Sequence, residues 1–348
     1  MYSVKRTTLD WLQSFLSNRQ QHCVVEGSIS KSQRVVCGVP QGSILGPLLF
    51  LLYINDLPEC LQFTKPHMYA DDTILSAAAE STIEVQSRIN QDLFNAGNWL
   101  VANKLSINVA KTEHMFFGSN FRLSNLGKTV PIFLGDKQIK RVKHTKYLGV
   151  HLDENLKWEE HVDNICSKIN RSINGLRQAR DYVDLDVLKT IYNALIQPVF
   201  DYCDAVWGNL NKGLASKIQK LQNRAARVIT FQGYDTRSED LLEFLNWDNL
   251  ALRRNKRLCL LMYDTIHKKV PQYLSDLFPL SCESNPYKSR LRENTLKIEM
   301  THIPRTESFK GSFSYRGAKL WNSLPLNVKS AKSKAIFKKD LTDCQAVA

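Results

Sequence analysis

Two adjacent aspartates, Asp71 and Asp72, are the residues of this sequence whose type and spacing best fit a chemical task. Strand-forming residues flank them, Met68-Tyr69-Ala70 before and Thr73-Ile74-Leu75 after, which predicts two strands joined at an acidic turn. Two carboxylates so close repel each other, and a bound divalent cation such as Mg²⁺ would relieve the repulsion. The alternative is that Asp-Asp is ordinary turn chemistry on a solvated hairpin. The pair taken alone favours that alternative.

A second unusual string, Gly38-Val39-Pro40-Gln41-Gly42-Ser43, precedes the aspartates and runs into the apolar residues 44–54. Three glycines and two prolines within residues 38–47 indicate an unusual backbone path that could approach a nucleotide or a nucleic-acid backbone closely. A helix cap with tight turns is the alternative, and it explains the glycines but not the whole string. Ser43 predicts the start of a helix that ends near Asp56.

Together, the glycine–proline string and Tyr69-Ala70-Asp71-Asp72 resemble the reverse transcriptases of non-LTR (LINE-type, jockey-like) retrotransposons. Further segments match motifs of that family in the same order along the chain. The resemblance is dense over residues 8–160 and looser beyond them. The matching segments are 11–20, 103–105 with Trp99 and Asn108, 111–112, 146–150, 221–227 and 320–325.

This resemblance implies RNA-directed DNA synthesis with Mg²⁺, an RNA template, a DNA primer and deoxynucleotides. It implies that Asp71 binds the catalytic metal ions with support from Asp72, and that Lys111 is a candidate proton donor to the departing pyrophosphate. An exposed lysine at a strand end is a nearly equal interpretation of Lys111. The residues expected to contact template or nucleotide are Pro40, Gln41, Gly42, Tyr69, Tyr147 and Gly149.

The same resemblance predicts an incomplete catalytic centre. In these polymerases a further essential aspartate comes from an earlier palm strand, and a fingers region grips the nucleotide. Asp10 is the one acid ahead of Trp11, and it lies in a helical pattern, whereas Asp56 ends a helix. We therefore expect an N-terminally truncated, inactive fragment. The alternative is a non-catalytic nucleic-acid-binding remnant.

The residue pattern predicts an α+β fold in which strands and helices give way to helices alone. By resemblance, we expect a partial polymerase palm with an antiparallel sheet at 1–155, a helical thumb at 156–270 and a basic, loosely structured extension at 271–348. Helices are expected at 9–16, 82–100, 158–180, 184–198, 212–230, 238–245 and 247–268. Strands are expected at 21–26 and 33–37 as one hairpin, at 105–108 and 113–117, around a turn at Gly135-Asp136, and at 147–152.

Positive charge is concentrated in the second half. The chain of 348 residues has a net charge of +13, and residues after 174 hold 28 basic and 18 acidic groups. Lys217, Lys220, Arg224 and Arg227 recur at helical spacing and could track phosphates. The interpretation favoured from sequence is that they form the solvated face of a packed helix.

Several classes of protein are not expected. An ordinary globular composition argues against a disordered or collagen-like chain. Eight scattered cysteines give no support to a zinc site or a disulfide framework, and we expect reduced thiols in an intracellular, nuclear or cytoplasmic protein. The longest apolar run, Ile44 to Ile54, is too short to span a membrane, and we expect no signal peptide.

Overall fold

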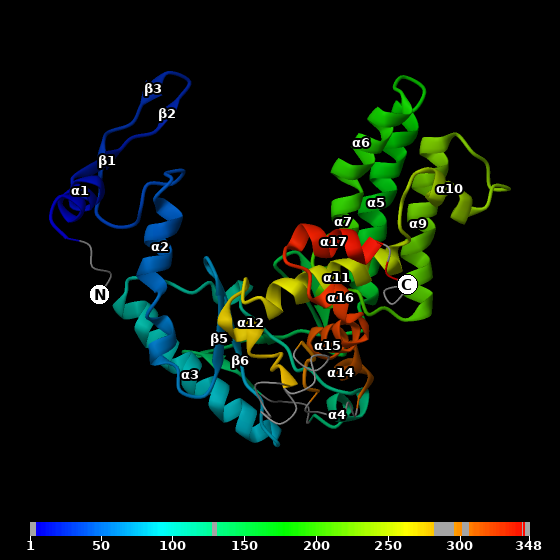
Figure 1. The fold of residues 1–348 in the computed structure, drawn as a ribbon. Helices are drawn as coiled ribbons and strands as arrows, with labels where there is room; N and C mark the ends of the chain where they lie inside the picture. The colour runs from blue at the N-terminus through cyan, green and yellow to red at the C-terminus, as the bar shows by residue number, and fades with distance from the viewer. Residues whose placement is uncertain (1–4, 127–130, 282–295, 301–305, 343, 345–348) are drawn as a thin grey trace. The chain divides into compact units, whose positions relative to one another are not determined.

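The structure is a computed structural model that describes residues 5–126, 131–281, 296–300, 306–342 and 344. Helices alternate with small two-stranded sheets, most of them antiparallel, and the expected mixture of helix and strand is confirmed at this level. The chain forms two compact units, one of residues 1–115 and 120–142 and one of residues 116–119 and 143–348 (Figure 1). Assigning them to a palm and a thumb remains a prediction.

The first unit opens with helix α1 (Thr7–Leu16), as predicted, followed by two nested hairpins. Strand β1 (Arg19–Gln21) pairs with β4 (Gln33–Val35), and β2 (Val24–Val25) pairs with β3 (Ser28–Ile29). The turn was expected at 27–32, but the chain reverses at Glu26-Gly27, where both residues have positive φ. Two such residues form the tight turn that antiparallel strands favour.

Helix α2 (Gly46–Ile54) begins three residues after Ser43, because the Ser43 hydroxyl belongs to the preceding turn. It donates to the Pro40 carbonyl at 2.8 Å and accepts the Gly46 N–H at 3.0 Å. The 3₁₀ helix η1 (Leu57–Cys60) follows. The antiparallel pair β5 (Lys65–Tyr69) and β6 (Asp72–Ser76) and the long helix α3 (Thr82–Ala102) come next, as predicted.

The remainder of this unit corrects two strand predictions. Residues 105–108 form no strand, and 113–117 contribute only β7 (Glu113–His114), because the 3₁₀ helix η2 (Val109–Lys111) interrupts the extended chain. The expected hairpin at Gly135-Asp136 is confirmed as β8 (Phe133–Leu134) and β9 (Lys137–Gln138). The other elements are helix α4 (Asn120–Ser124) and strand β10 (Lys140–Arg141), which pairs in parallel with β7.

The second unit begins with a hairpin where a single strand was predicted. Strand β11 (His144–Tyr147) pairs with β12 (Val150–Asp153), and the chain turns at Leu148-Gly149. Both turn residues have positive φ, 45° and 83°. The apolar run 147–152 therefore reads as one strand in sequence, although its glycine reverses the chain.

Helices account for most of the second unit, and their predicted positions are largely confirmed. The expected helix 184–198 is divided, because α6 ends at Leu195 and Pro198 lies in the first turn of α7. The helices of this unit up to residue 275 are α5 (Glu159–Ala179), α6 (Leu185–Leu195), α7 (Gln197–Asp201), α8 (Asp204–Trp207), α9 (Lys212–Thr230), α10 (Ser238–Phe244), α11 (Leu250–Ile266) and α12 (Gln272–Ser275).

Residues 306–342 are more ordered than the weak periodicity after Pro271 indicates. They form α14 (Glu307–Gly311), α15 (Phe313–Ser323), α16 (Leu326–Lys329) and α17 (Lys334–Thr342). Trp321 and Phe337 are fully buried and pack with Met262 of α11 in one apolar cluster. None of the described helices is both long and apolar enough to cross a membrane.

Candidate functional site

The β5–β6 hairpin places Asp71 and Asp72 at its tip, as the sequence predicts. Tyr69 and Asp72 are the last paired residues, so Ala70 and Asp71 form a two-residue turn. Ala70 adopts a left-handed φ of 52°. Both aspartate side chains are exposed, as is Tyr69 across the ladder from Asp72. The tip therefore presents two carboxylates to a ligand from outside the protein.

A buried aspartate that sequence reasoning missed fixes the start of this hairpin. Asp92 of α3 is fully buried and accepts hydrogen bonds from the backbone N–H groups of Gln62, Phe63 and Thr64 at 2.7–2.9 Å. The Thr64 hydroxyl adds a fourth at 2.8 Å. Burial by itself would raise the pKa of Asp92, but these hydrogen bonds together lower it. Asp92 thus ties α3 to the residues that lead into β5.

The exposed pair fits a hard cation only in part. Mg²⁺ prefers oxygen ligands and takes one or two carboxylates together with substrate phosphates and water. Asp71 and Asp72 could supply the carboxylates. Among the described residues, no group of three or more His, Cys, Asp or Glu is arranged to hold a metal ion. The hairpin therefore offers a partial ligand set for divalent metal.

The glycine–proline string forms a succession of turns ahead of α2. Gly38 and Gly42 have φ of 76° and 81°, a conformation that favours glycine. The Arg19 guanidinium donates to the Gly38 carbonyl at 2.5 Å and so holds the string against β1. The Gln41 side chain is exposed and Pro40 is half-buried. Contact between this string and the hairpin tip remains a prediction.

Lys111 is exposed at the end of the 3₁₀ helix η2. It lies in the same unit as Asp71, and the local structure fits the alternative of an exposed lysine equally well. Its role as proton donor therefore stays a prediction.

Tyr147 and Gly149 lie in the second unit, on the β11–β12 hairpin. The hydroxyl of Tyr202 donates to the Leu148 carbonyl at 2.5 Å. A Cβ atom on Gly149 would lie 3.3 Å from Cε1 of the Tyr202 ring. Tyr202, which no sequence pattern singled out, therefore supports this turn.

Three members of the predicted phosphate-binding stripe on α9 have partners within the protein. Lys217 forms an ion pair with Asp163 of α5, and Arg224 donates to the Asn170 side chain at 3.0 Å. Arg227 donates to the carbonyls of Gly233 and Thr236 at 3.1 and 3.2 Å and lies over the Tyr234 ring. Lys220 is exposed. These contacts favour a structural role for most of the stripe.

The basic run 253–257 of α11 is also occupied by internal partners. Arg253 binds Asp201 through two hydrogen bonds of 2.9 and 2.7 Å, and Arg257 binds Asp204 at 2.7 Å. Arg254 is buried against the Trp207 ring, and burial lowers its pKa to about 10. Lys256 pairs with Asp248. Dense positive charge in the sequence therefore serves here to join α7, α8 and α11.

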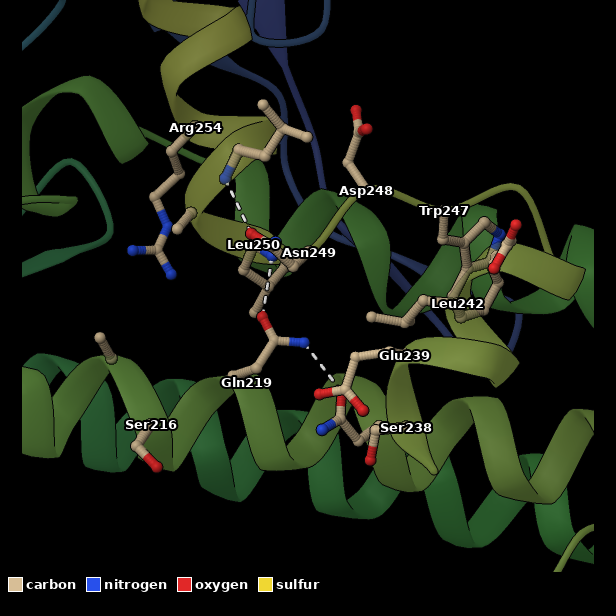
Figure 2. Close-up of a pocket in the computed structure, with 15 residues that line it drawn as sticks. Ser216, Gln219, Ser238, Glu239, Leu242, Trp247, Asp248, Asn249, Leu250 and Arg254 are labelled. Atoms are coloured by element: carbon tan, nitrogen blue, oxygen red, sulfur yellow. Dashed lines mark hydrogen bonds between the residues drawn. The ribbon is translucent and has the colours of Figure 1, made fainter. Parts of the chain in front are cut away.

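A cavity of about 560 Å³ lies between α9, α10 and the start of α11 (Figure 2). Gln219 occupies its centre, where its amide accepts the Leu250 N–H at 2.9 Å and donates to Asn223 at 2.8 Å. Glu239, Glu243 and the buried Arg254 also line the cavity. Because its central amide is satisfied by the protein and its charges are mixed, we assign no ligand to it.

Comparison with known proteins supplies the family. Residues 1–152 match the family described as reverse transcriptase (RNA-dependent DNA polymerase). The chain is 27% identical over 269 residues to a probable RNA-directed DNA polymerase from transposon X-element of Drosophila melanogaster, which covers 75% of this chain and 28% of that protein. It is 30% identical over 246 residues to a probable RNA-directed DNA polymerase from transposon BS of the same species, covering 68% and 27%.

A third relative is the RNA-directed DNA polymerase from mobile element jockey of Drosophila melanogaster, 27% identical over 240 residues, which make up 66% of this chain and 26% of that protein. The chain thus spans little more than a quarter of the length of these three relatives.

Proposed function

Residues 1–152 of this chain belong to the reverse transcriptase family of non-LTR retrotransposons, and from that premise we propose that the β5–β6 hairpin carries metal-binding carboxylates of an RNA-directed DNA polymerase. One observation carries the proposal: the acidic pair lies at the exposed tip of a hairpin inside the family's matched region, with Asp71 in the two-residue turn and Asp72 as the first residue of β6. The substrates would be an RNA template, a DNA primer and deoxynucleotides.

The chemistry is phosphoryl transfer, for which bound Mg²⁺ supplies charge stabilisation at the phosphate oxygens. Asp71, at the turn, would be the principal ligand, and Asp72 would add a second carboxylate from the first residue of β6. Asp92 keeps the hairpin in place by holding the backbone ahead of β5. Gln41 and Gly42 would contact template and nucleotide, and Lys111 would donate a proton to the departing pyrophosphate.

Two-metal catalysis needs more than two carboxylates, and among the residues described here no third one is grouped with Asp71 and Asp72. Because the family resemblance implies a further essential aspartate, the narrower proposal is that the 348-residue chain by itself does not extend a primer. The second candidate function is that of a non-catalytic nucleic-acid-binding protein, favoured by the positive charge of residues 175–348.

Metal binding by the hairpin tests the proposal without requiring activity. Mn²⁺ can be titrated into the chain and the free ion followed by electron paramagnetic resonance. We expect D71A to weaken the strongest binding at least tenfold. Asp136 provides a matched control, because it is an exposed aspartate in the two-residue turn of β8–β9 in the same unit. D136A should leave Mn²⁺ binding unchanged.

Equal affinity in D71A and the unsubstituted chain would remove the hairpin from the metal site. Equal weakening by D71A and D136A would indicate general attraction between Mn²⁺ and surface carboxylates. Either result would leave the second candidate function.

A further inference from the structure

A group of exposed cations, most of them without acidic partners in the described structure, gathers at a place that the sequence pattern does not single out. At the corner where the end of α11 meets the start of α17, five exposed lysines come from two segments that are more than 60 residues apart. We call them the lysine corner: Lys268, Lys269, Lys332, Lys334 and Lys338.

Tyr263 holds the two segments together. Its side chain is buried, its hydroxyl donates to the Ala331 carbonyl at 3.1 Å, and its ring centre lies 4.7 Å from that of Phe337. The Lys269 ammonium lies 5.4 Å from the centre of the same ring. Both segments belong to one compact unit, and α17 runs beside α11 in Figure 1. The lysine corner is therefore built on a packed core.

Little negative charge faces the lysine corner. Lys334 pairs with Asp264 of α11, whereas within the described chain no ion pair involves the other four lysines. Asp340 is the one acid of α17, and at 100° per residue it lies on the opposite flank of the helix from Lys334 and Lys338. His267 stacks on Tyr263, and its Nδ1 lies 2.8 Å from the Tyr263 carbonyl. Four ammonium groups are left without a counter-ion in the described structure.

We propose that the lysine corner binds the sugar–phosphate backbone of nucleic acid without selecting its sequence. Ammonium groups on flexible stems contact phosphates as point charges and do not read base edges in the paired, planar way that arginine does. The clustering of four uncompensated positive charges complements a chain of phosphates. This surface lies in the second unit and requires no metal ion, so it is separate from the function proposed for Asp71.

The test is a salt titration of binding to a labelled oligouridylate, in the presence of a chelator so that metal binding plays no part. The lysine corner is neutralised by K268Q/K269Q/K332Q/K338Q. The matched control, K168Q/R171Q/R177Q/K212Q, removes the same charge from exposed positions on α5 and α9 that lie outside the stripe. If each corner lysine neutralises one phosphate, the slope of log affinity against log salt should flatten by about three units, at about 0.7 per phosphate of a single strand.

The control variant should keep the slope of the unsubstituted chain, and replacing the same four corner lysines by arginine should restore it. An unchanged slope in the corner variant would overturn the proposal, as would equal flattening in both variants, which would indicate net charge alone. Binding to phosphatidylserine vesicles without binding to the oligonucleotide would identify a membrane surface instead. Circular dichroism melting of each variant establishes that all of them fold.

Discussion

Asp92 offers a direct test of what holds the acidic hairpin in place. Asp92→Asn replaces one carboxylate oxygen by an NH₂ group, which cannot accept the N–H bonds directed at it. The carboxylate accepts four hydrogen bonds, and a buried donor left without its acceptor costs about 1–3 kcal/mol. We expect the substitution to destabilise the α3–β5 connection by about 3 kcal/mol. At least one backbone N–H group loses its acceptor, and the remaining hydrogen bonds no longer go to a charged carboxylate.

Hydrogen exchange with mass spectrometry measures this effect locally, in the residues that Asp92 contacts. Amides of Gln62, Phe63 and Thr64 should exchange about 100-fold faster in D92N, since 1.4 kcal/mol corresponds to a factor of ten. E84Q is the control, because it removes the same charge from an exposed position of the same helix. Exchange in residues 62–64 should not change in E84Q.

The pH dependence adds a second check on the same carboxylate. Since the fold lowers the pKa of Asp92, its contribution is present above the ordinary carboxyl pKa and is lost as pH falls through the lower folded value. The difference between D92N and the unsubstituted chain should therefore be full at neutral pH and shrink below about pH 4. Protection of residues 62–64 that is equal in both proteins at neutral pH would refute the assigned role.

Three further outcomes are expected. Burial beside Trp207 lowers the pKa of His161 to about 4, so the second unit should lose up to about 3 kcal/mol of stability as pH falls from about 6.5 to 4. In H161Q, the free energy of unfolding, measured with denaturant, should depend less on pH over this range. Gly149→Ala should destabilise the β11–β12 turn by about 1–3 kcal/mol through its positive φ and the Tyr202 ring, and a thermal melt unchanged from that of the unsubstituted chain would contradict this. The 348-residue chain should give no primer extension with Mg²⁺ on a poly-ribonucleotide template, and extension abolished by D71A would show that the ligand set is complete.

Local sequence patterns were sufficient to predict the helices and the hairpin whose structure depends on residues close together in the chain. Strand-forming residues on both sides of Asp71 and Asp72 predicted a hairpin with its acidic turn, and helical periodicity predicted α5, α9 and α11. Patterns failed at single residues that redirect the backbone. Gly149 turned a predicted strand into a hairpin. Next to the 3₁₀ helix at 109–111, the strand predicted at 105–108 does not form and the one predicted at 113–117 is shortened to two residues.

The roles of charged side chains were decided by tertiary structure. In sequence, the stripe on α9 is a solvated helix face that could track phosphates, yet Lys217 and Arg224 contact α5 across 54 residues of chain. Lys268 and Lys332 show no shared pattern in sequence, yet Tyr263 brings their segments to one corner. A helical period fixes which side chains share a face, whereas the partner of a charge is set by whichever distant segment packs beside it. For this reason sequence patterns were enough to predict the acidic hairpin and the family, whereas the packed structure was needed to show which positive charges have partners within the protein.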